Sequence, residues 1–291
     1  MKRAGSGQLA AGSEGNCQRN VLLSLCPLPA AYCPLTMIDT HCHLTDENLL
    51  RQLPDVLARA AEAGVREMVT VATDVDDSRA CVELCRGHAN VRCTVGIHPN
   101  YAYTATAADV AKLEIFLTSI GNGVVAMGEM GLDYFHNHTP RPHQHAVFRA
   151  QLGMAVEREM PVVIHCREAV DDCLAVMSDF PGVRAVFHCF TGTADEAKRI
   201  VAAGHLIGFT GAVTFKKADA LREAAKGVPD DRILVETDAP YLTPEPMRKQ
   251  KINEPARVVH VAQTLAAVRG TTVAEIDRLT TANAKRFFRW D

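Results

Sequence analysis

From residue 37 onward the chain alternates short β-branched runs with longer stretches whose apolar residues recur at helical spacing. Many of the helix-like stretches finish at Gly or Pro, as at Gly64, Gly204 and Gly227. The eight candidate strands are residues 37–44, 66–73, 91–99, 124–133, 161–168, 184–192, 205–213 and 232–240. Eight strand–helix units within about 255 residues predict an α/β protein with a single (β/α)8 TIM barrel.

A doubly wound parallel sheet is the structural alternative. Such nucleotide-binding sheets carry a GxGxxG turn after the first strand or a P-loop lysine motif, and the sequence has neither. No low-complexity linker divides the chain after residue 37. We therefore expect residues 37–291 to form one TIM-barrel hydrolase domain.

Residues 1–36 differ in composition from the remainder, being polar and rich in Gly, Ala and Ser before a short apolar stretch at 21–31. Lys2, Arg3 and that stretch are features of a signal peptide. However, the two charges lie far from the stretch, and Pro27 and Pro29 interrupt it. We expect residues 1–36 to be an unstructured, disordered extension, with an upstream start codon and Met37 as the natural first residue.

The charge balance, 31 Lys and Arg against 34 Asp and Glu, indicates no general nucleic-acid or membrane surface. It leaves room for a local basic patch, and bound metal ions would add positive charge. The 10 cysteines form no CxxC pair and lie mostly within apolar runs, which favours a reduced, cytoplasmic protein. No apolar run approaches the ~20 residues of a membrane-spanning helix, so no membrane partner is expected.

Polar residues recur at the ends of the candidate strands, where TIM barrels carry their catalytic groups. Each follows an apolar run that would otherwise be pure core, and 12 histidines scattered at random would not gather at equivalent places on successive strands. The residues in question are His41, His43, His98, Glu129, His165, His188 and Asp238.

The spacing of His41 and His43 is typical of two side chains that bind the same metal ion. Residues i and i+2 of a strand point to the same face, so both imidazoles can converge while Cys42 turns away. Imidazole and carboxylate ligands suit zinc, manganese, iron or nickel, and carboxylates also admit magnesium. Six of these residues are candidate ligands: His41, His43, Glu129, His165, His188 and Asp238. They exceed the need of one tetrahedral ion, which predicts two metals with Glu129 between them. Two ions ~3.5–4 Å apart can activate water and stabilise both the attacking and the leaving oxygen.

Taken singly, each of these residues has an ordinary explanation. A lone strand-end histidine is more often a hydrogen-bonded core or surface residue, and a strand-end carboxylate often caps the next helix. Their joint placement favours a metal centre, because six such groups left unpaired in one barrel mouth would be costly to bury. We expect Cys42, Cys166 and Cys189 to face away from the centre and to pack between strands and helices. For the histidines at 136, 138, 143 and 145, a solvated loop and helix start is favoured, and contact with substrate is the alternative.

The ordered motifs IDTHCHL, GIHP, GEMGLDY, PVVIHCRE, FHCFTG, ETDAPYL, RKQKINEP and TTANAKRFF resemble those of the TatD family of metal-dependent deoxyribonucleases. The resemblance covers residues 37–290, and the ordered set is far more specific than HxH alone. It implies an amidohydrolase-like TIM barrel with two divalent metal ions (Zn, Mg or Mn) and a hydrolytic centre.

Residue by residue, the resemblance makes His41 and His43 ligands of the first metal, Glu129 the bridge, and His165 and His188 ligands of the second. Asp238 would complete the first site and act with Glu129 in catalysis, as the general base for the attacking water. His98, Arg167 and Arg248 would contact substrate, and the Asn253–Glu254 pair would line the mouth. Either arginine could bind phosphodiester oxygens bidentately, or could equally form an ordinary surface salt bridge.

The sequence departs from the family pattern at two places. Asn100 stands where the family usually has a second histidine after GxHP, and Arg248-Lys249-Gln250 stands where it has Arg-Gly-Lys. Neither touches a proposed ligand, so the departures bear on substrate preference and not on hydrolysis itself.

The function expected first is a deoxyribonuclease that hydrolyses phosphodiester bonds from the end of a DNA strand, acting as a monomer. Its near-neutral charge fits an enzyme that holds a strand end through metals and a few cations. The same activated water would serve an amidohydrolase or esterase on a small metabolite, or an aminoacyl-tRNA deacylase, because fold does not fix substrate. A metal-binding accessory protein without turnover is the third alternative, and the intact ligand set including Asp238 argues against it.

Overall fold

The computed structural model describes residues 35–118, 123–136 and 138–290. Eight parallel strands form one sheet in the order of the sequence, each paired with the next along the chain. The strands are β1 (Met37–Cys42), β2 (Val65–Thr70), β3 (Val91–Val95), β4 (Val124–Asp133), β5 (Val162–Arg167), β6 (Ala185–Phe187), β7 (Leu206–Phe209) and β8 (Ile233–Val235).

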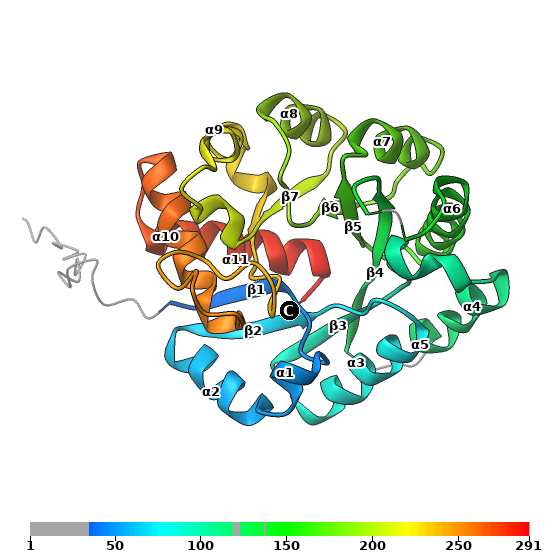
Figure 1. Ribbon diagram of the computed structural model, residues 1–291, viewed down its shortest axis with the longest axis horizontal. Helices are drawn as coiled ribbons and strands as arrows, with labels where there is room; N and C mark the ends of the chain where they lie inside the picture. The colour runs from blue at the N-terminus through cyan, green and yellow to red at the C-terminus, as the bar shows by residue number, and fades with distance from the viewer. Residues whose placement is uncertain (1–34, 119–122, 137, 291) are drawn as a thin grey trace, which may run out of the picture. The chain divides into compact units, whose positions relative to one another are not determined.

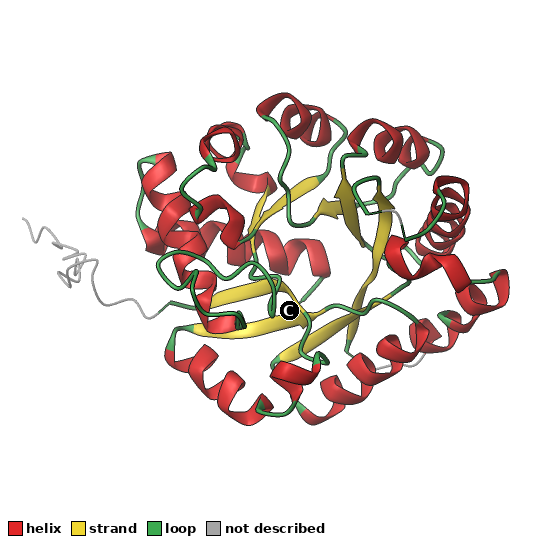
Figure 2. Cartoon of the chain, viewed as in Figure 1, coloured by secondary structure: helices red, strands yellow, loops and turns green. Residues whose placement is uncertain are grey.

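Helices follow the strands and surround them (Figure 1, Figure 2). The α-helices are α1 (Glu47–Leu50), α2 (Leu53–Glu62), α3 (Val75–Gly87), α4 (Ala107–Lys112), α5 (Glu114–Thr118), α6 (Arg141–Glu157), α7 (Val170–Ser178), α8 (Ala194–Ala202), α9 (Asp219–Gly227), α10 (Val258–Arg269) and α11 (Val273–Phe288). Short 3-10 helices lie at η2 (Pro99–Thr104), η3 (Gly211–Thr214), η4 (Asp230–Arg232) and η5 (Pro255–Arg257).

The last strand meets the first, which nearly closes the barrel. Cys42 and Ala239 form an isolated parallel bridge just beyond β8. The His43 N–H donates to the Ala239 carbonyl at 2.7 Å, and the Asp238 N–H donates to the His41 carbonyl at 2.8 Å. The predicted TIM barrel is therefore confirmed, and its closing contacts lie at the strand ends that carry the candidate ligands.

The barrel is apolar near the amino-terminal ends of its strands, where α11 covers it. Phe287, Phe288 and Trp290 join one buried cluster with inward residues near the strand starts, among them Ile38 and Leu234. The Asn283 amide donates to the Ile233 carbonyl at 2.9 Å, which fixes α11 at the start of β8. α11 lies within the outline of the strand ring (Figure 1).

Residues 1–34 lie outside the described residues, and so does nearly all of the predicted extension. Leu35 is already packed against the core, and the Thr36 N–H donates to Asp277 Oδ2 at 2.8 Å. Among the described residues, no helix combines the length and apolar character needed to cross a membrane. The seven cysteines of the described residues are free thiols.

Candidate metal centre

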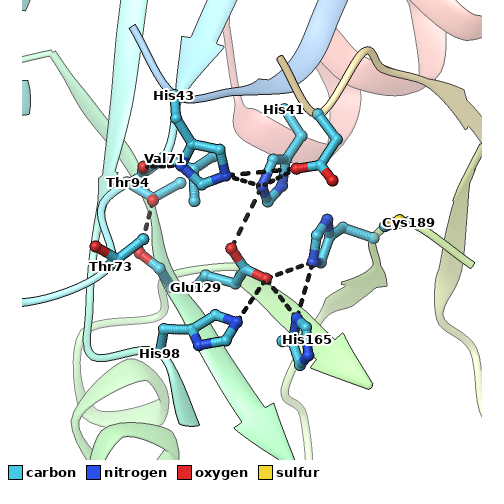
Figure 3. Close-up of polar contacts among 12 residues, drawn as sticks. His41, His43, Val71, Thr73, Thr94, His98, Glu129, His165 and Cys189 are labelled. Atoms are coloured by element: carbon cyan, nitrogen blue, oxygen red, sulfur yellow. Dashed lines mark hydrogen bonds and ion pairs between the residues drawn. The ribbon is translucent and has the colours of Figure 1, made fainter. Parts of the chain in front are cut away.

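The carboxylate of Glu129, on β4, lies at the middle of a ring of imidazoles (Figure 3). Its Oε1 lies 2.5 Å from His188 Nε2 and 2.7 Å from His165 Nδ1. Its Oε2 lies 3.4 Å from His41 Nε2. The two oxygens of one buried carboxylate thus face two different groups of histidines, as a bridging ligand would.

Asp238 completes the side of the ring that His41 and His43 occupy. Its Oδ1 lies 3.4 Å from His43 Nε2 and 3.7 Å from His41 Nε2, and the two histidine Nε2 atoms are 3.3 Å apart. The structure therefore brings together all six residues proposed as ligands. Compact groups within reach of a single ion are His41, His188 and Asp238; His41, His43 and Glu129; and His98, Glu129 and His165.

Local backbone geometry explains why these side chains converge. His41 and His43 alternate with Cys42, whose thiol turns away as expected and lies 3.4 Å from the Val69 carbonyl. Asp238 sits just past β8 with φ 56°, a left-handed conformation that a non-glycine residue rarely adopts. Such strain persists where surrounding contacts impose it, often at functional sites.

The tautomers of the histidines indicate which nitrogens can bind a cation. His43 Nδ1 is 2.9 Å from the Val71 carbonyl, so this nitrogen donates and the neutral ring offers its Nε2 lone pair to the centre. His165 Nε2 is 3.0 Å from Asp133 Oδ2, which directs its Nδ1 lone pair towards Glu129. Metal-binding histidines are held in this way by a carbonyl or carboxylate on the other nitrogen. The donor set, imidazole nitrogens with two carboxylates, fits divalent metal ions.

The electrostatics of the centre also suit cations. Burial alone would lower the pKa of His43, but Asp238 and Glu129 raise it to about 9. His165 behaves likewise, since Asp133 and Glu129 overcome burial and raise its pKa to about 10. In contrast, burial and the charge of His188 lower the pKa of His41 to about 4. The carboxylates thus create a negative potential that attracts a proton or, in its place, a metal ion.

His98 differs from the proposed ligands. Its Nδ1 accepts the Asn100 N–H at 3.0 Å, so the neutral ring carries its hydrogen on Nε2. That Nε2 points at Glu129 Oε1 from 3.4 Å. Burial and the charge of His165 lower the pKa of His98 to about 4, which keeps the ring neutral. His98 therefore presents a hydrogen-bond donor to the centre, where the proposed ligands present lone pairs.

Two buried acids that contact the histidines were not among the predicted site residues. Asp133, at the end of β4, accepts from His165. Glu236 Oε1 accepts the Cys189 N–H at 2.5 Å and lies 3.7 Å from His188 Nδ1. Both belong to the quoted motifs GEMGLDY and ETDAPYL, where Asp133 follows Glu129 by four residues and Glu236 precedes Asp238 by two, and this proximity was the available signal.

The centre opens into a pocket of about 930 Å³ at the carboxyl ends of the strands. Arg167 lines this pocket, as do His136 and His138, which the sequence had placed in a solvated loop. Cys166 and Cys189 are also among the lining residues, but Cys166 packs against the hydrophobic core as expected, and Cys189 Sγ lies 3.7 Å from Thr210 Oγ1. Cys189 lies beyond the end of β6 with φ 45°, so simple strand alternation no longer applies to it.

Arg248 and the Asn253–Glu254 pair lie elsewhere. Arg248 is not among the residues that line the pocket, and its guanidinium lies 4.1 Å from the centre of the Phe215 ring. The buried Asn253 amide donates to the Thr237 carbonyl at 3.0 Å, and Glu254 pairs with Arg59. These contacts hold the loop after β8 in place, so we assign Arg248, Asn253 and Glu254 a structural role.

A TIM barrel with this ring of histidines and carboxylates at the carboxyl ends of its strands defines the class of metal-dependent hydrolases. The profile of the TatD related DNase family matches residues 38–289. This match shows that the chain belongs to the TatD family, and it is a metal-dependent hydrolase.

Curated relatives and solved structures agree with this assignment. The uncharacterized metal-dependent hydrolase YabD of Bacillus subtilis is 37% identical over 255 residues, which cover 87% of this chain and 99% of YabD. A 3'-5' ssDNA/RNA exonuclease TatD of Erwinia amylovora is 37% identical over 260 residues, with 87% and 99% covered. The crystal structure of the TatD homologue YjjV of Escherichia coli superposes with a TM-score of 0.84 at 28% identity, covering 89% of this chain and all of YjjV.

Proposed function

We propose that this hydrolase removes nucleotides from the end of a single DNA strand with the help of two divalent metal ions. The observation that carries the proposal is the placement of Glu129, whose two oxygens face separate groups of histidines. His41, His43 and Asp238 would hold one ion, His165 and His188 the other, and Glu129 both. The relatives named 3'-5' ssDNA/RNA exonuclease support a 3' end as the point of attack.

When bound, the metal ions would lower the pKa of a water molecule and stabilise charge on the phosphate oxygens. Asp238 is placed to accept the proton of that water. Burial alone would raise the pKa of Asp238, but the hydrogen bond from His43 and neighbouring imidazoles lower it, so the carboxylate is ready as a base.

Two residues are suited to the substrate phosphate. His98 directs its Nε2–H into the centre, where it can donate to a phosphate oxygen. Arg167 lines the pocket and can bind phosphate oxygens bidentately. Arg248, which stays on Phe215, has no contact that supports the same role.

The proposal is tested with metal-stripped protein and single-stranded oligonucleotides labelled at the 5' or the 3' end. Restoring Mg²⁺, Mn²⁺ or Zn²⁺ in turn should produce stepwise shortening from the 3' end. Asp238→Asn should lower the rate at least about 100-fold, because general-base catalysis contributes 10²–10⁴-fold. Asp231→Asn, which changes an exposed carboxylate paired with Arg232, is the matched control and should keep the rate.

Near-normal cleavage by a folded Asp238→Asn variant would refute the role of Asp238. A wild-type protein that binds two metals and cleaves no oligonucleotide would refute the nuclease function. The small-metabolite ester or amide and the aminoacyl-tRNA would then be the substrates to assay. We also propose that the protein is cytoplasmic, which the free thiols of the described cysteines support, and that it is a monomer. Localisation of a fluorescent fusion tests the first point, and light scattering tests the second.

A further inference from the structure

The exposed aromatic side chains of this protein gather in one place. Among the described residues, the large aromatic side chains that are at least half exposed are Tyr101 (50%), Tyr103 (59%), Phe135 (56%) and Tyr241 (57%). Tyr101, Tyr103 and Tyr241 line the pocket of the metal centre. We call these four residues the aromatic rim. A concentrated exposed apolar surface next to a site commonly marks an interaction.

The rim is assembled from separate loops around the histidines. Tyr101 and Tyr103 belong to η2 after β3, Phe135 follows β4, and Tyr241 follows β8. The ring of Tyr101 lies edge-on to His98 with centroids 6.0 Å apart, and that of Tyr241 lies edge-on to His43 at 5.9 Å. Phe135 lies under the guanidinium of Arg167, 5.0 Å from its ring centroid. Each side of the proposed phosphate position thus has an exposed ring nearby.

The charges around the pocket limit what this rim can bind by electrostatic attraction. Arg167 is the one Lys or Arg among the residues that line the pocket. The carboxylates that line it are Asp46, Asp77, Glu129, Asp133 and Asp238. Such a lining would not hold a long polyanion through its phosphates, since that mode of binding needs many cations. Beyond Arg167, His98 and the metal centre, which would bind one phosphate, the flat and uncharged ring faces are available to the rest of the substrate.

We propose that the aromatic rim is a stacking site for unpaired nucleobases on either side of the phosphodiester that is cleaved. This inference rests on the proposed nuclease function, and it identifies the unpaired bases as the part of the substrate that the rim recognises. Aromatic side chains stack on every base, so the site tolerates any sequence. In a duplex the base faces are covered by their neighbours and the partner strand holds them in place, so the rim selects single strands.

The test compares Tyr101→Ala/Tyr241→Ala with wild type on two 3'-terminal substrates, one normal and one in which the last three nucleotides lack their bases. In wild type, removing the bases should raise KM at least about fivefold, which corresponds to ~1 kcal/mol for a lost stack. In the double variant KM should already be raised for the normal strand, and removing the bases should raise it little further. This loss of additivity is what direct contact between ring and base produces.

Two controls accompany this comparison. Tyr101→Phe/Tyr241→Phe retains both rings and should restore the sensitivity to missing bases. Val156→Ala changes an exposed apolar side chain on α6 that does not line the pocket, and should leave KM unchanged. Thermal melting of each variant checks that the barrel is folded.

The outcomes separate the two proposals. Metal-dependent cleavage by wild type, with equal KM for normal and base-free ends, would overturn the rim and leave the nuclease intact. An equal penalty for missing bases in wild type and in the double variant would also overturn the rim, because the bases would then be bound elsewhere. Absence of cleavage of any strand would refute the nuclease function itself.

Discussion

Three histidines of the metal centre are oriented by the hydrogen-bond partner of their second ring nitrogen. His43 is fixed by the Val71 carbonyl, His165 by Asp133, and His98 by the Asn100 N–H. The first two partners accept a hydrogen bond, and the third donates one. His43 and His165 therefore present a nitrogen lone pair to the centre, whereas His98 presents an N–H group. Chemically equal side chains thereby take the roles of ligand and of hydrogen-bond donor.

Asp133 is the partner whose removal should be most informative. Asp133→Asn weakens the charge that holds His165 in its ligand tautomer, so the affinity for the second metal should fall about 10–100-fold. Isothermal titration of metal-stripped protein measures this effect, with Asp179→Asn, an exposed carboxylate on the protein surface, as the control. Unchanged affinity at both sites would show that Asp133 does not support the metal.

The sequence analysis anticipated the six proposed ligands but not their supporting acids. His41 and Asp238 stand out because each interrupts an apolar run at a strand end, which a pattern of spacing can detect. Asp133 and Glu236 lie beside such residues, where a helix cap or a solvated turn gives the same pattern. The position of Arg248 was equally hidden, because spacing within a loop does not fix the direction of a side chain.

At the scale of the elements, the strands were predicted well and their ends less well. β6 and β8 span Ala185–Phe187 and Ile233–Val235, whereas 184–192 and 232–240 were expected. Just beyond both strands, Cys189 and Asp238 adopt positive φ values that take the chain out of the sheet. The residues that follow each short strand turn into the barrel mouth, and hydrophobic periodicity carries no sign of that turn.

The connection between α8 and β7 buries a histidine that should make stability depend on pH. His205 is 6% exposed, and its Nδ1 has no hydrogen-bond partner among the described residues. Burial, followed by the charge of Arg232, lowers its pKa from 6.5 to about 4. The unfolded chain therefore takes up a proton before the folded chain does. The stabilisation is fully present above pH 6.5 and is lost as the pH falls towards 4, by about 3 kcal/mol.

His205→Phe should remove this contribution, because phenylalanine does not titrate and can pack beside Phe187. Urea unfolding at several pH values between 4 and 7 measures the effect. The free energy of unfolding of the variant should fall less steeply towards pH 4 than that of wild type. Parallel curves for the two proteins would show that His205 is not protonated on unfolding.

At the scale of the whole molecule, the two ends of the barrel carry separate tasks. The carboxyl ends of the strands hold the metal centre, while α11 covers the amino-terminal ends with Phe287, Phe288 and Trp290. Trp290 also lies under Arg92, 5.0 Å from its ring centroid. Stability and chemistry should therefore be separable by substitution.

Phe287→Ala tests this separation. Phe287 is 4% exposed, and truncating a buried phenylalanine costs about 3–5 kcal/mol. We expect a lower midpoint of urea unfolding, with the KM and kcat of the folded enzyme close to wild type. A matched exposed substitution, Val156→Ala on α6, should leave the midpoint in place. A large fall in kcat at full folding would show that α11 influences the centre.

The contact of α11 with Thr36 and β1 has a consequence for synthesis. Thr36 bonds to Asp277, and Ile38 packs in the same cluster as Phe287, although more than two hundred residues separate these partners. A nascent barrel emerging from the ribosome must keep its interior uncovered until α11 has left the exit tunnel. Ribosome-bound chains that stop before residue 273 should be cut readily by protease, and chains extended past α11 should resist. The enzyme is therefore expected to depend on chaperones during translation and not after release.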